Sequence, residues 1–197
     1  MKPKGFYLSY SQINLYLNNP QQYYVQYILK HKPPPTRGMI LGKIGHQAIA
    51  DPKYDWRAAF RRERFLGAEE RAMERILAKV KRPDMAEQEF FIENQAVCPL
   101  YGFIDGIDDD GTLYEHKFSL GGWNQMTVDD NFQISFYGYV YKLLYGRAPK
   151  KIILNHCNPT TGSVTSYTHP EMKRDDYRGV KNAIESAYTG IINQSWE

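Results

Sequence analysis

A stretch of acidic and apolar residues near the middle of the chain constrains the fold most. Residues 102–117 read GFIDGIDDDGTLYEHK. Apolar residues lie on both sides of three aspartates and a glycine at positions 108–111, which is typical of two strands joined by a tight turn. The sequence therefore predicts a β-hairpin whose turn lies at these acidic residues.

Three charged residues of this hairpin can converge. Because side chains alternate between the faces of a strand, Asp105, Glu115 and Lys117 can project from one face. Tyr114 and His116 then point to the other. Two carboxylates can hold Mg²⁺ or Mn²⁺ against a phosphate, and a nearby lysine can orient an attacking water and offset developing charge. The trio predicts phosphodiester hydrolysis. The alternative is that the acids only decorate a turn and that Lys117 is an ordinary exposed strand residue.

Two more motifs lie on either side of the hairpin. Gly42 and His46 form G-x-x-x-H within residues 39–50, which read as a short buried helix. Gln133 and Tyr137 form Q-x-x-x-Y in a predicted helix after the hairpin. Taken alone, a histidine near an apolar face is more often a hydrogen-bonded core residue than a ligand, and the second pair reads as ordinary helix residues.

Together, the four motifs resemble the signature of PD-(D/E)XK nucleases, particularly the RecB-like branch that includes CRISPR-associated and phage recombination exonucleases. In that branch G-x-I-D precedes a turn and (D/E)-x-K, as residues 102–105 and 115–117 do here. A G-x-x-x-H helix lies upstream and a Q-x-x-x-Y helix follows. The resemblance covers most of the chain. It implies a restriction-endonuclease-like core, an α/β domain whose central mixed sheet is flanked by helices.

The resemblance also implies roles for individual residues. Asp105, Glu115 and Lys117 would be catalytic, with Lys117 positioning the attacking water. The metal ligands would be His46, Asp105, Glu115 and the backbone carbonyl of His116. An imidazole ligand makes Mn²⁺ as suitable as Mg²⁺. Gln133 and Tyr137 would contact the substrate strand.

Two further positions have open alternatives. Relatives often place a glutamate beside the metal, at the start of the strand before the hairpin. Glu87 fits that place best because Phe90 follows it, as in the family. Glu89 and Glu93 compete with it, and all three also read as exposed edge residues. Trp123, after a glycine-containing turn, is placed either to stack on a nucleobase or to cap the core.

The cysteines argue against an iron-sulfur cluster. Several relatives hold a cluster with four cysteines, one of them in the pattern C-P-x-x-(F/Y)-(F/Y). Here residues 19–24 read NPQQYY, and the chain has 2 Cys. Four thiolates are the usual minimum for a cluster. Cys98 and Cys157 lie in apolar, strand-like contexts and read as buried free thiols, so we expect neither a cluster nor a disulfide.

Caps and periodicity predict the remaining elements. Ser9 with Gln12 forms a capping box that starts a helix, which breaks near residues 18–20. Residues 31–38, HKPPPTRG, are expected to be extended. Asp129 is expected to cap a helix that runs to about Tyr145. Other helices are expected at 21–30, 56–81 (with a break near Gly67 as an alternative) and 172–192, and strands at 87–97, 151–156 and 163–168.

Length and charge indicate one domain, residues 1–197, with a basic helical part at 1–83 and the catalytic sheet and helices at 84–197. Residues 1–83 contain 16 of the 25 Lys and Arg but only 6 of the 22 Asp and Glu. A basic half beside an acidic half suits a protein that attracts phosphates and cuts them. The alternative is a solvated helix surface, because arginine and glutamate alternate along residues 57–75.

The function expected is a metal-dependent DNA nuclease, most simply an exonuclease in recombination, repair or phage DNA processing. The alternatives are a structure-specific endonuclease and a catalytically silent nucleic-acid-binding module. The expected partner is DNA, as a single strand or a duplex end, with a helicase or a single-strand annealing protein as a further candidate. Residues 1–12 lack the apolar core of a signal peptide, and no apolar run reaches about 18 residues, so we expect a cytoplasmic protein without membrane contact.

Overall fold

A five-stranded mixed sheet forms the centre of the protein. The structure is a computed structural model that describes residue 3 and residues 5–196. The strands follow the order β1-β2-β3-β4-β5, and only the β3–β4 pair is parallel. They are β1 (Met85–Ile92), β2 (Leu100–Ile107), β3 (Thr112–Phe118), β4 (Lys151–Cys157) and β5 (Val164–His169). The expected α/β architecture with a mixed sheet is confirmed.

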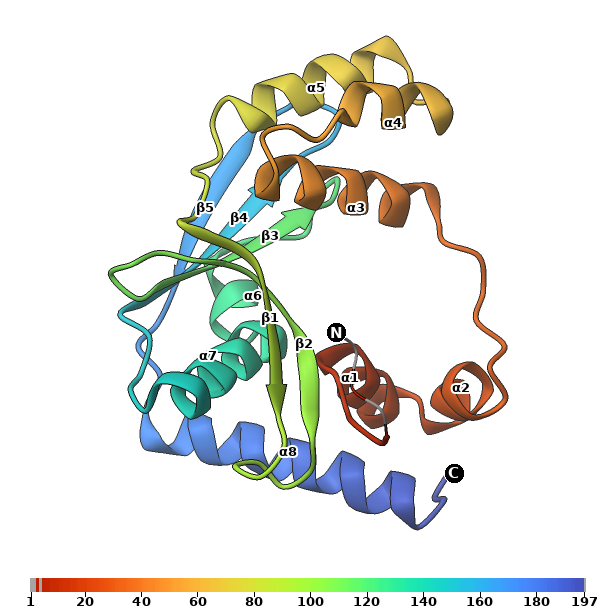
Figure 1. Cartoon of the computed structure of the whole chain (residues 1–197), viewed down its shortest axis with the longest axis vertical. Helices are drawn as coiled ribbons and strands as arrows, with labels where there is room; N and C mark the ends of the chain where they lie inside the picture. The colour runs from red at the N-terminus through yellow and green to blue at the C-terminus, as the bar shows by residue number, and fades with distance from the viewer. Residues whose placement is uncertain (1–2, 4, 197) are drawn as a thin grey trace.

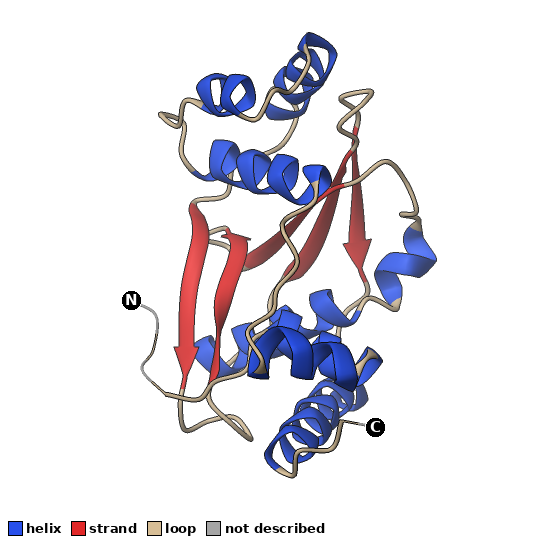
Figure 2. Ribbon diagram, turned by 90° about the vertical axis from the view of Figure 1, so that its right-hand side faces the viewer, coloured by secondary structure: helices blue, strands red, loops and turns tan. Residues whose placement is uncertain are grey.

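Helices cover both sides of this sheet, as Figures 1 and 2 show. One group comprises α3 (Arg37–Ala50), α4 (Trp56–Arg62) and α5 (Gly67–Leu77). The other group comprises α6 (Gln125–Asp129), α7 (Phe132–Tyr145) and α8 (Arg174–Ile192). The α6–α7 crossover joins the parallel strands β3 and β4, which no tight turn could do. The larger core lies between the sheet and α7, α8 and the N-terminal helix α1 (Tyr10–Asn18), and a smaller one lies among α3, α4 and α5.

The N-terminal part folds as a small helical unit against the edge of β2 and against α8. It contains α1 (Tyr10–Asn18), α2 (Pro20–Tyr23) and the π-helix η1 (Tyr24–Ile28). The predicted capping box is present, with the Ser9 side chain accepting from the Gln12 backbone N–H. Tyr16 donates a hydrogen bond to the carbonyl of Ser195 at 2.7 Å, which ties α1 to the end of α8.

The strands β2 and β3 separate soon after their turn. They pair only at Gly106 with Tyr114 and at Ile107 with Leu113. The rest of β2 continues beside β1, and β3 continues beside β4. The N-terminal segment occupies the free edge of β2, where Leu8 forms a parallel bridge with Leu100. The two strands therefore form a fork.

Some boundaries differ from those the sequence predicted. Asp129 does not cap the long helix; it ends the short helix α6, and Asn131 caps α7 by accepting from the Ile134 backbone N–H. Three consecutive cap-forming residues, Asp129, Asp130 and Asn131, follow Val128, so the local pattern left the boundary ambiguous. The expected strand at 87–97 runs from Met85 to Ile92, and residues 93–98 form bends before β2.

Three further boundaries moved. Of the two possibilities for residues 56–81, one helix or two with a break near Gly67, the structure has the second: residues 63–66, where Arg64 has a positive φ of 56°, divide α4 from α5. Residues 31–36 are irregular and exposed, and α3 starts at Arg37 because Thr36 caps it. The closing helix α8 starts at Arg174 rather than at 172. Among the described residues, no helix is long and apolar enough to cross a bilayer.

Candidate active site

The fork between β2 and β3 holds the two acidic residues of the predicted trio. Asp105 lies on β2 and Glu115 on β3, one residue beyond the last paired positions. Both side chains are largely buried, with 12% of Asp105 and 4% of Glu115 exposed. The backbone N–H of His116 donates to Asp105 Oδ2 at 2.7 Å, so β3 itself orients the carboxylate of β2. Strand separation thus creates a buried acidic site.

The histidine of α3 reaches the same place. His46 Nδ1 lies 3.3 Å from Asp105 Oδ1 and 3.8 Å from Glu87 Oε1. A close helix–strand contact permits this reach: a Cβ atom added at Gly45 would lie 2.2 Å from the ring of Phe118 on β3. Ligand atoms of His46, Glu87 and Asp105 all lie within 4.8 Å of one another, close enough to hold one metal ion.

Glu87 is the glutamate of β1 that the structure brings to this cluster. In the β1–β2 register Ala86 pairs with Gly106 and Gln88 with Ile104, so Glu87 lies opposite Asp105. Its backbone has a positive φ of 48°, which L-residues rarely adopt and which costs about 1–3 kcal/mol. Of the competing residues, Glu89 instead accepts a hydrogen bond from the Tyr101 hydroxyl at 2.8 Å. Glu93 lies beyond the end of β1.

Lys117 connects the buried glutamate to α7. Its Nζ lies 2.6 Å from Glu115 Oε1 and donates to Gln133 Oε1 at 2.5 Å. Gln133 Nε2 in turn lies 3.5 Å from the Tyr137 hydroxyl. The second carboxylate oxygen, Glu115 Oε2, is buried and has no hydrogen-bond partner among the described residues. Because an unpartnered buried acceptor is costly, this oxygen fits a site that receives a cation.

Charges in the cluster shift one another. Burial lowers the pKa of His46, but Asp105, Glu115 and Glu87 outweigh burial and raise that pKa to about 9. Burial and the Asp105 charge raise the pKa of Glu115 to about 7, against the opposing effect of Lys117. Burial would raise the pKa of Asp105, yet His46 and the backbone of His116 hold it below its usual value. Three carboxylates therefore share one imidazole and one ammonium.

His116 contributes its backbone to the site and turns its ring away. Asn155 Nδ2 lies 3.3 Å from its Nδ1. Burial lowers the pKa of the ring to about 4, so it is neutral. The predicted role of its carbonyl as a metal ligand stays a prediction.

Trp123 lies outside this arrangement. It packs beside the main core, it does not line the pocket described below, and its carbonyl accepts from the Tyr167 hydroxyl at 3.0 Å. Of the two roles the sequence allowed, the structure favours packing.

Both cysteines are buried free thiols, as expected, and burial raises the pKa of Cys98 to about 11 and that of Cys157 to about 12.

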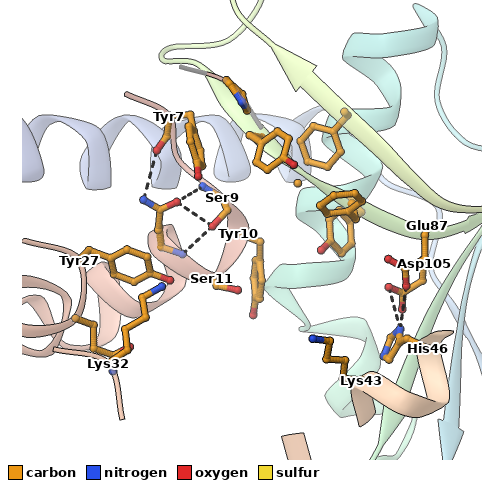
Figure 3. Close-up of a pocket in the computed structure, with 18 of the residues that line it drawn as sticks. Tyr7, Ser9, Tyr10, Ser11, Tyr27, Lys32, Lys43, His46, Glu87 and Asp105 are labelled. Atoms are coloured by element: carbon orange, nitrogen blue, oxygen red, sulfur yellow. Dashed lines mark hydrogen bonds and ion pairs between the residues drawn. The ribbon is translucent and has the colours of Figure 1, made fainter. Parts of the chain in front are cut away.

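A pocket of about 1410 Å³ opens in front of the acidic cluster. The N-terminal helices, α3, β1 and β2 contribute to its walls, and His46, Glu87 and Asp105 lie at one end (Figure 3). The sequence analysis did not assign most of the lining side chains to the site, and Tyr10, Lys43, Tyr101 and Phe103 are among those it missed. The alternation that placed Asp105 could have identified Tyr101 and Phe103, which share its face of β2.

Comparisons with known proteins agree with this geometry. A family model described as the PD-(D/E)XK nuclease superfamily matches residues 7–197. The chain belongs to that superfamily. The motifs that suggested PD-(D/E)XK membership therefore led to the correct superfamily, while the RecB-like branch stays a prediction.

Solved structures support the fold of this PD-(D/E)XK protein. A candidate exonuclease from Eubacterium rectale superposes with a TM-score of 0.68 at 10% identity, covering 94% of this chain and 80% of that one. A second structure, of SSO0001, has a TM-score of 0.39 at 14% identity. The match covers 76% of this chain and 84% of that one. A search of curated proteins gives no significant match.

Proposed function

We propose that this PD-(D/E)XK protein is a metal-dependent deoxyribonuclease that works from a free DNA end. The observation that carries the proposal is the surroundings of Glu115. This buried carboxylate faces Asp105 across the fork, holds Lys117 with one oxygen and has its other oxygen unpartnered. A structural ion pair would need only the first contact. A hydrolytic site needs both a lysine and a free ligand atom.

The residues present fit a divalent cation. His46, Glu87, Asp105 and Glu115 would hold it, since their oxygen and imidazole donors suit Mg²⁺ or Mn²⁺. When bound, the ion would polarise a phosphate oxygen and make a bound water more acidic. Ligand atoms must be free of protons, so His46 and Glu115 would each lose a proton on binding.

Lys117 is suited to stabilising charge rather than to taking up a proton. Burial lowers its pKa, but Glu115 outweighs burial and the pKa is raised, so the ammonium stays charged. Glu115 and Gln133 fix its position from two sides. A fixed ammonium can orient the attacking water and offset the negative charge that develops on the phosphate in the transition state. Gln133 also carries an amide nitrogen that can face the substrate backbone.

The surroundings of the pocket support action at a free end. Figure 1 shows residues 29–36 running from η1 to α3 on the side away from β2. Lys30 and Lys32 line the same pocket as Asp105 on β2 and His46 on α3. A nucleic-acid strand that reaches the acidic cluster between residues 29–36 and β2 enters most simply by its end. A structure-specific endonuclease is the alternative. The retained acids and lysine count against a silent binding module.

Metal binding and cleavage together test the proposal. Glu115→Gln should lose metal affinity and DNA cleavage, because it removes a charged ligand. Lys117→Ala should still bind metal by calorimetry yet cut linear DNA at least about 100-fold more slowly. Glu185→Gln and Lys181→Ala, on the exposed face of α8, are matched controls that should behave as wild type. Assays with Mg²⁺, Mn²⁺ and EDTA establish the metal requirement. Wild-type cleavage by Lys117→Ala would contradict the assignment.

DNA as substrate, a helicase or annealing partner, and a role in recombination, repair or phage DNA processing also remain part of this proposal. Superfamily membership and the basic residues that line the pocket support DNA as the substrate, whereas the partner and the role stay predictions. Parallel assays with DNA and RNA strands of the same sequence address the first point directly.

A further inference from the structure

One face of β2 leads directly to the acidic cluster. Because side chains alternate along a strand, Tyr101, Phe103 and Asp105 follow one another on the same face, about 7 Å apart at each step. The rings of Tyr101 and Phe103 have centroids 5.7 Å apart in an edge-to-face arrangement. Both residues line the pocket that contains Asp105. An aromatic row thus ends at a candidate metal ligand.

This row does not serve the hydrophobic core. Phe103 is 41% exposed, whereas Leu100 and Ile104, on the opposite face of β2, are fully buried. Neither Tyr101 nor Phe103 belongs to a core cluster of the described residues. A solitary exposed phenylalanine is unremarkable in a protein surface. Phe103 differs because it stands in a concave pocket, beside a second ring and two residues from Asp105.

Lysines line other parts of the pocket. Lys30 and Lys32 belong to the segment between η1 and α3, and Lys43 precedes His46 by three residues on α3. Figure 3 shows Lys43 pointing into the pocket beside His46. Among the described residues none of these lysines forms an ion pair, unlike Lys117. Lys32 Nζ lies 4.1 Å from the centroid of the Tyr27 ring. Lys30 and Lys43 have no such contact among the described residues and can reach phosphates, while the aromatic row on β2 offers surfaces for bases.

We propose that Phe103 and Tyr101 form a base-stacking subsite for the nucleotides next to the scissile phosphate, with Lys43 on the adjoining backbone. This subsite rests on the proposed nuclease function and specifies its substrate as a single strand. Bases within a duplex are stacked on each other and have no free face for Phe103, whereas bases of an extended single strand do. Because every base has an aromatic face, the subsite accepts any sequence.

Substitutions at Phe103 separate stacking from chemistry. Phe103→Leu keeps an apolar side chain but removes the ring, whereas Phe103→Tyr keeps the ring. Phe103→Leu should raise the KM for a linear single-stranded oligonucleotide by about 10-fold or more. It should leave unchanged the hydrolysis of methyl p-nitrophenyl phosphate, a diester without a base. Phe103→Tyr should resemble wild type. Phe91→Ala, a change at a phenylalanine that is also exposed (44%) but lies outside this pocket, is the matched control.

Abasic oligonucleotides give the sharper comparison. Wild type should bind a strand with abasic sites at the two terminal nucleotides about 10-fold more weakly than the intact strand, and Phe103→Leu should bind both equally. Fluorescence of a terminal 2-aminopurine, with EDTA present to prevent cleavage, should be quenched by wild type and not by Phe103→Leu. Lys43→Gln should weaken binding to intact and abasic strands alike. It should also reduce the slope of log affinity against log salt concentration by the amount expected for about one phosphate contact.

The outcomes distinguish this subsite from the function on which it rests. If wild type hydrolyses neither DNA nor the small diester, both proposals fail. If wild type hydrolyses both, but Phe103→Leu keeps the wild-type KM and still discriminates against abasic ends, the subsite alone is wrong. Loss of activity by Phe103→Leu on the small diester would also overturn it, because the residue would then act on the catalytic centre.

Discussion

At the scale of single residues, Glu87 shows how the site affects the backbone. It adopts a left-handed conformation at the position opposite Asp105, where its carboxylate faces His46. Glycine would adopt this conformation without strain. A glutamate at a strained position beside a candidate metal site is consistent with a functional reason for the side chain, since strain of this kind concentrates at functional sites.

Two substitutions at Glu87 separate the strain from the carboxylate. Glu87→Gly and Glu87→Ala both remove the proposed ligand, so both should weaken metal binding to the same extent. Only glycine relieves the strain, so Glu87→Gly should be about 1 kcal/mol more stable than Glu87→Ala. Urea unfolding of the metal-free variants measures the difference. Equal stability would show that the positive φ of Glu87 carries no strain in the folded protein.

Metal binding should depend on pH because two of the proposed ligands hold protons near neutral pH. The pKa of Glu115 is about 7 and that of His46 about 9 without metal. Protons compete with the ion for both groups, so the apparent affinity should rise with pH most steeply below about 7, less steeply between about 7 and 9, and level off above about 9. Calorimetry in buffers of different ionisation enthalpy should detect proton release. His46→Gln should remove the part of the rise nearest pH 9, and an unchanged profile would exclude His46 as a ligand.

At the scale of elements, close contacts depend on glycine. A Cβ atom added at Gly190 on α8 would lie 2.0 Å from the hydroxyl of Tyr16 on α1. That hydroxyl already donates to Ser195, so it has little room to move. The position of the N-terminal helical unit, and with it one wall of the pocket, thus depends on this helix–helix contact.

Alanine at two glycines of α8 should have opposite effects. Gly190→Ala should destabilise the protein by about 1–3 kcal/mol, because the added methyl group overpacks the α1–α8 contact. Gly179→Ala, where no atom lies within 4 Å of the added Cβ, should stabilise by up to about 1 kcal/mol through helix propensity. Thermal unfolding of both variants makes the comparison. Stabilisation by both would show that α1 can shift away from α8 at no cost.

Local signals predicted the elements well where they were unambiguous. The capping box at Ser9 specifies a helix start, and the acidic turn before β3 specifies a hairpin. Both signals consist of residues close together in the sequence. The fork was not predictable, because the bridge between Leu8 and Leu100 joins distant parts of the chain. The sequence favoured Glu87 but left Glu89 and Glu93 as alternatives, because the left-handed backbone that directs the Glu87 side chain has no local signal.

For the candidate site, alternation on the strands placed Asp105, Glu115 and Lys117 on one face, and the structure brings them together with His46. The same alternation applied to Tyr101 and Phe103, yet aromatic residues in a strand read as core packing. Their exposure depends on the pocket that separates α3 and the N-terminal helical unit from this face of β2. That separation is a tertiary property with no local pattern.

At the scale of the whole molecule, the pocket makes a topological prediction. Figure 1 shows residues 29–36 running from η1 to α3 on the side away from β2, and Lys30 and Lys32 of this segment line the pocket. We therefore expect a strand between that segment and β2 to enter by an end. A linear single strand should be degraded, whereas the same oligonucleotide ligated into a circle should persist at least about tenfold longer. One nick in the circle should restore degradation. Cleavage of the intact circle at the linear rate would favour the endonuclease alternative.

The contacts of the N-terminal unit also bear on when the protein becomes active during its own synthesis. Residues 8 and 16 leave the ribosome early, but their partners are residue 100 in β2 and residue 195 after α8. Contacts between such distant segments form late, because both segments must first exist and the long intervening loop must close. Before α8 is translated, the N-terminal helical unit lacks the contact with Ser195 that ties it to the rest of the protein. A nascent chain, or one stopped short by a premature termination codon, would therefore lack the wall of the pocket that the N-terminal helical unit provides.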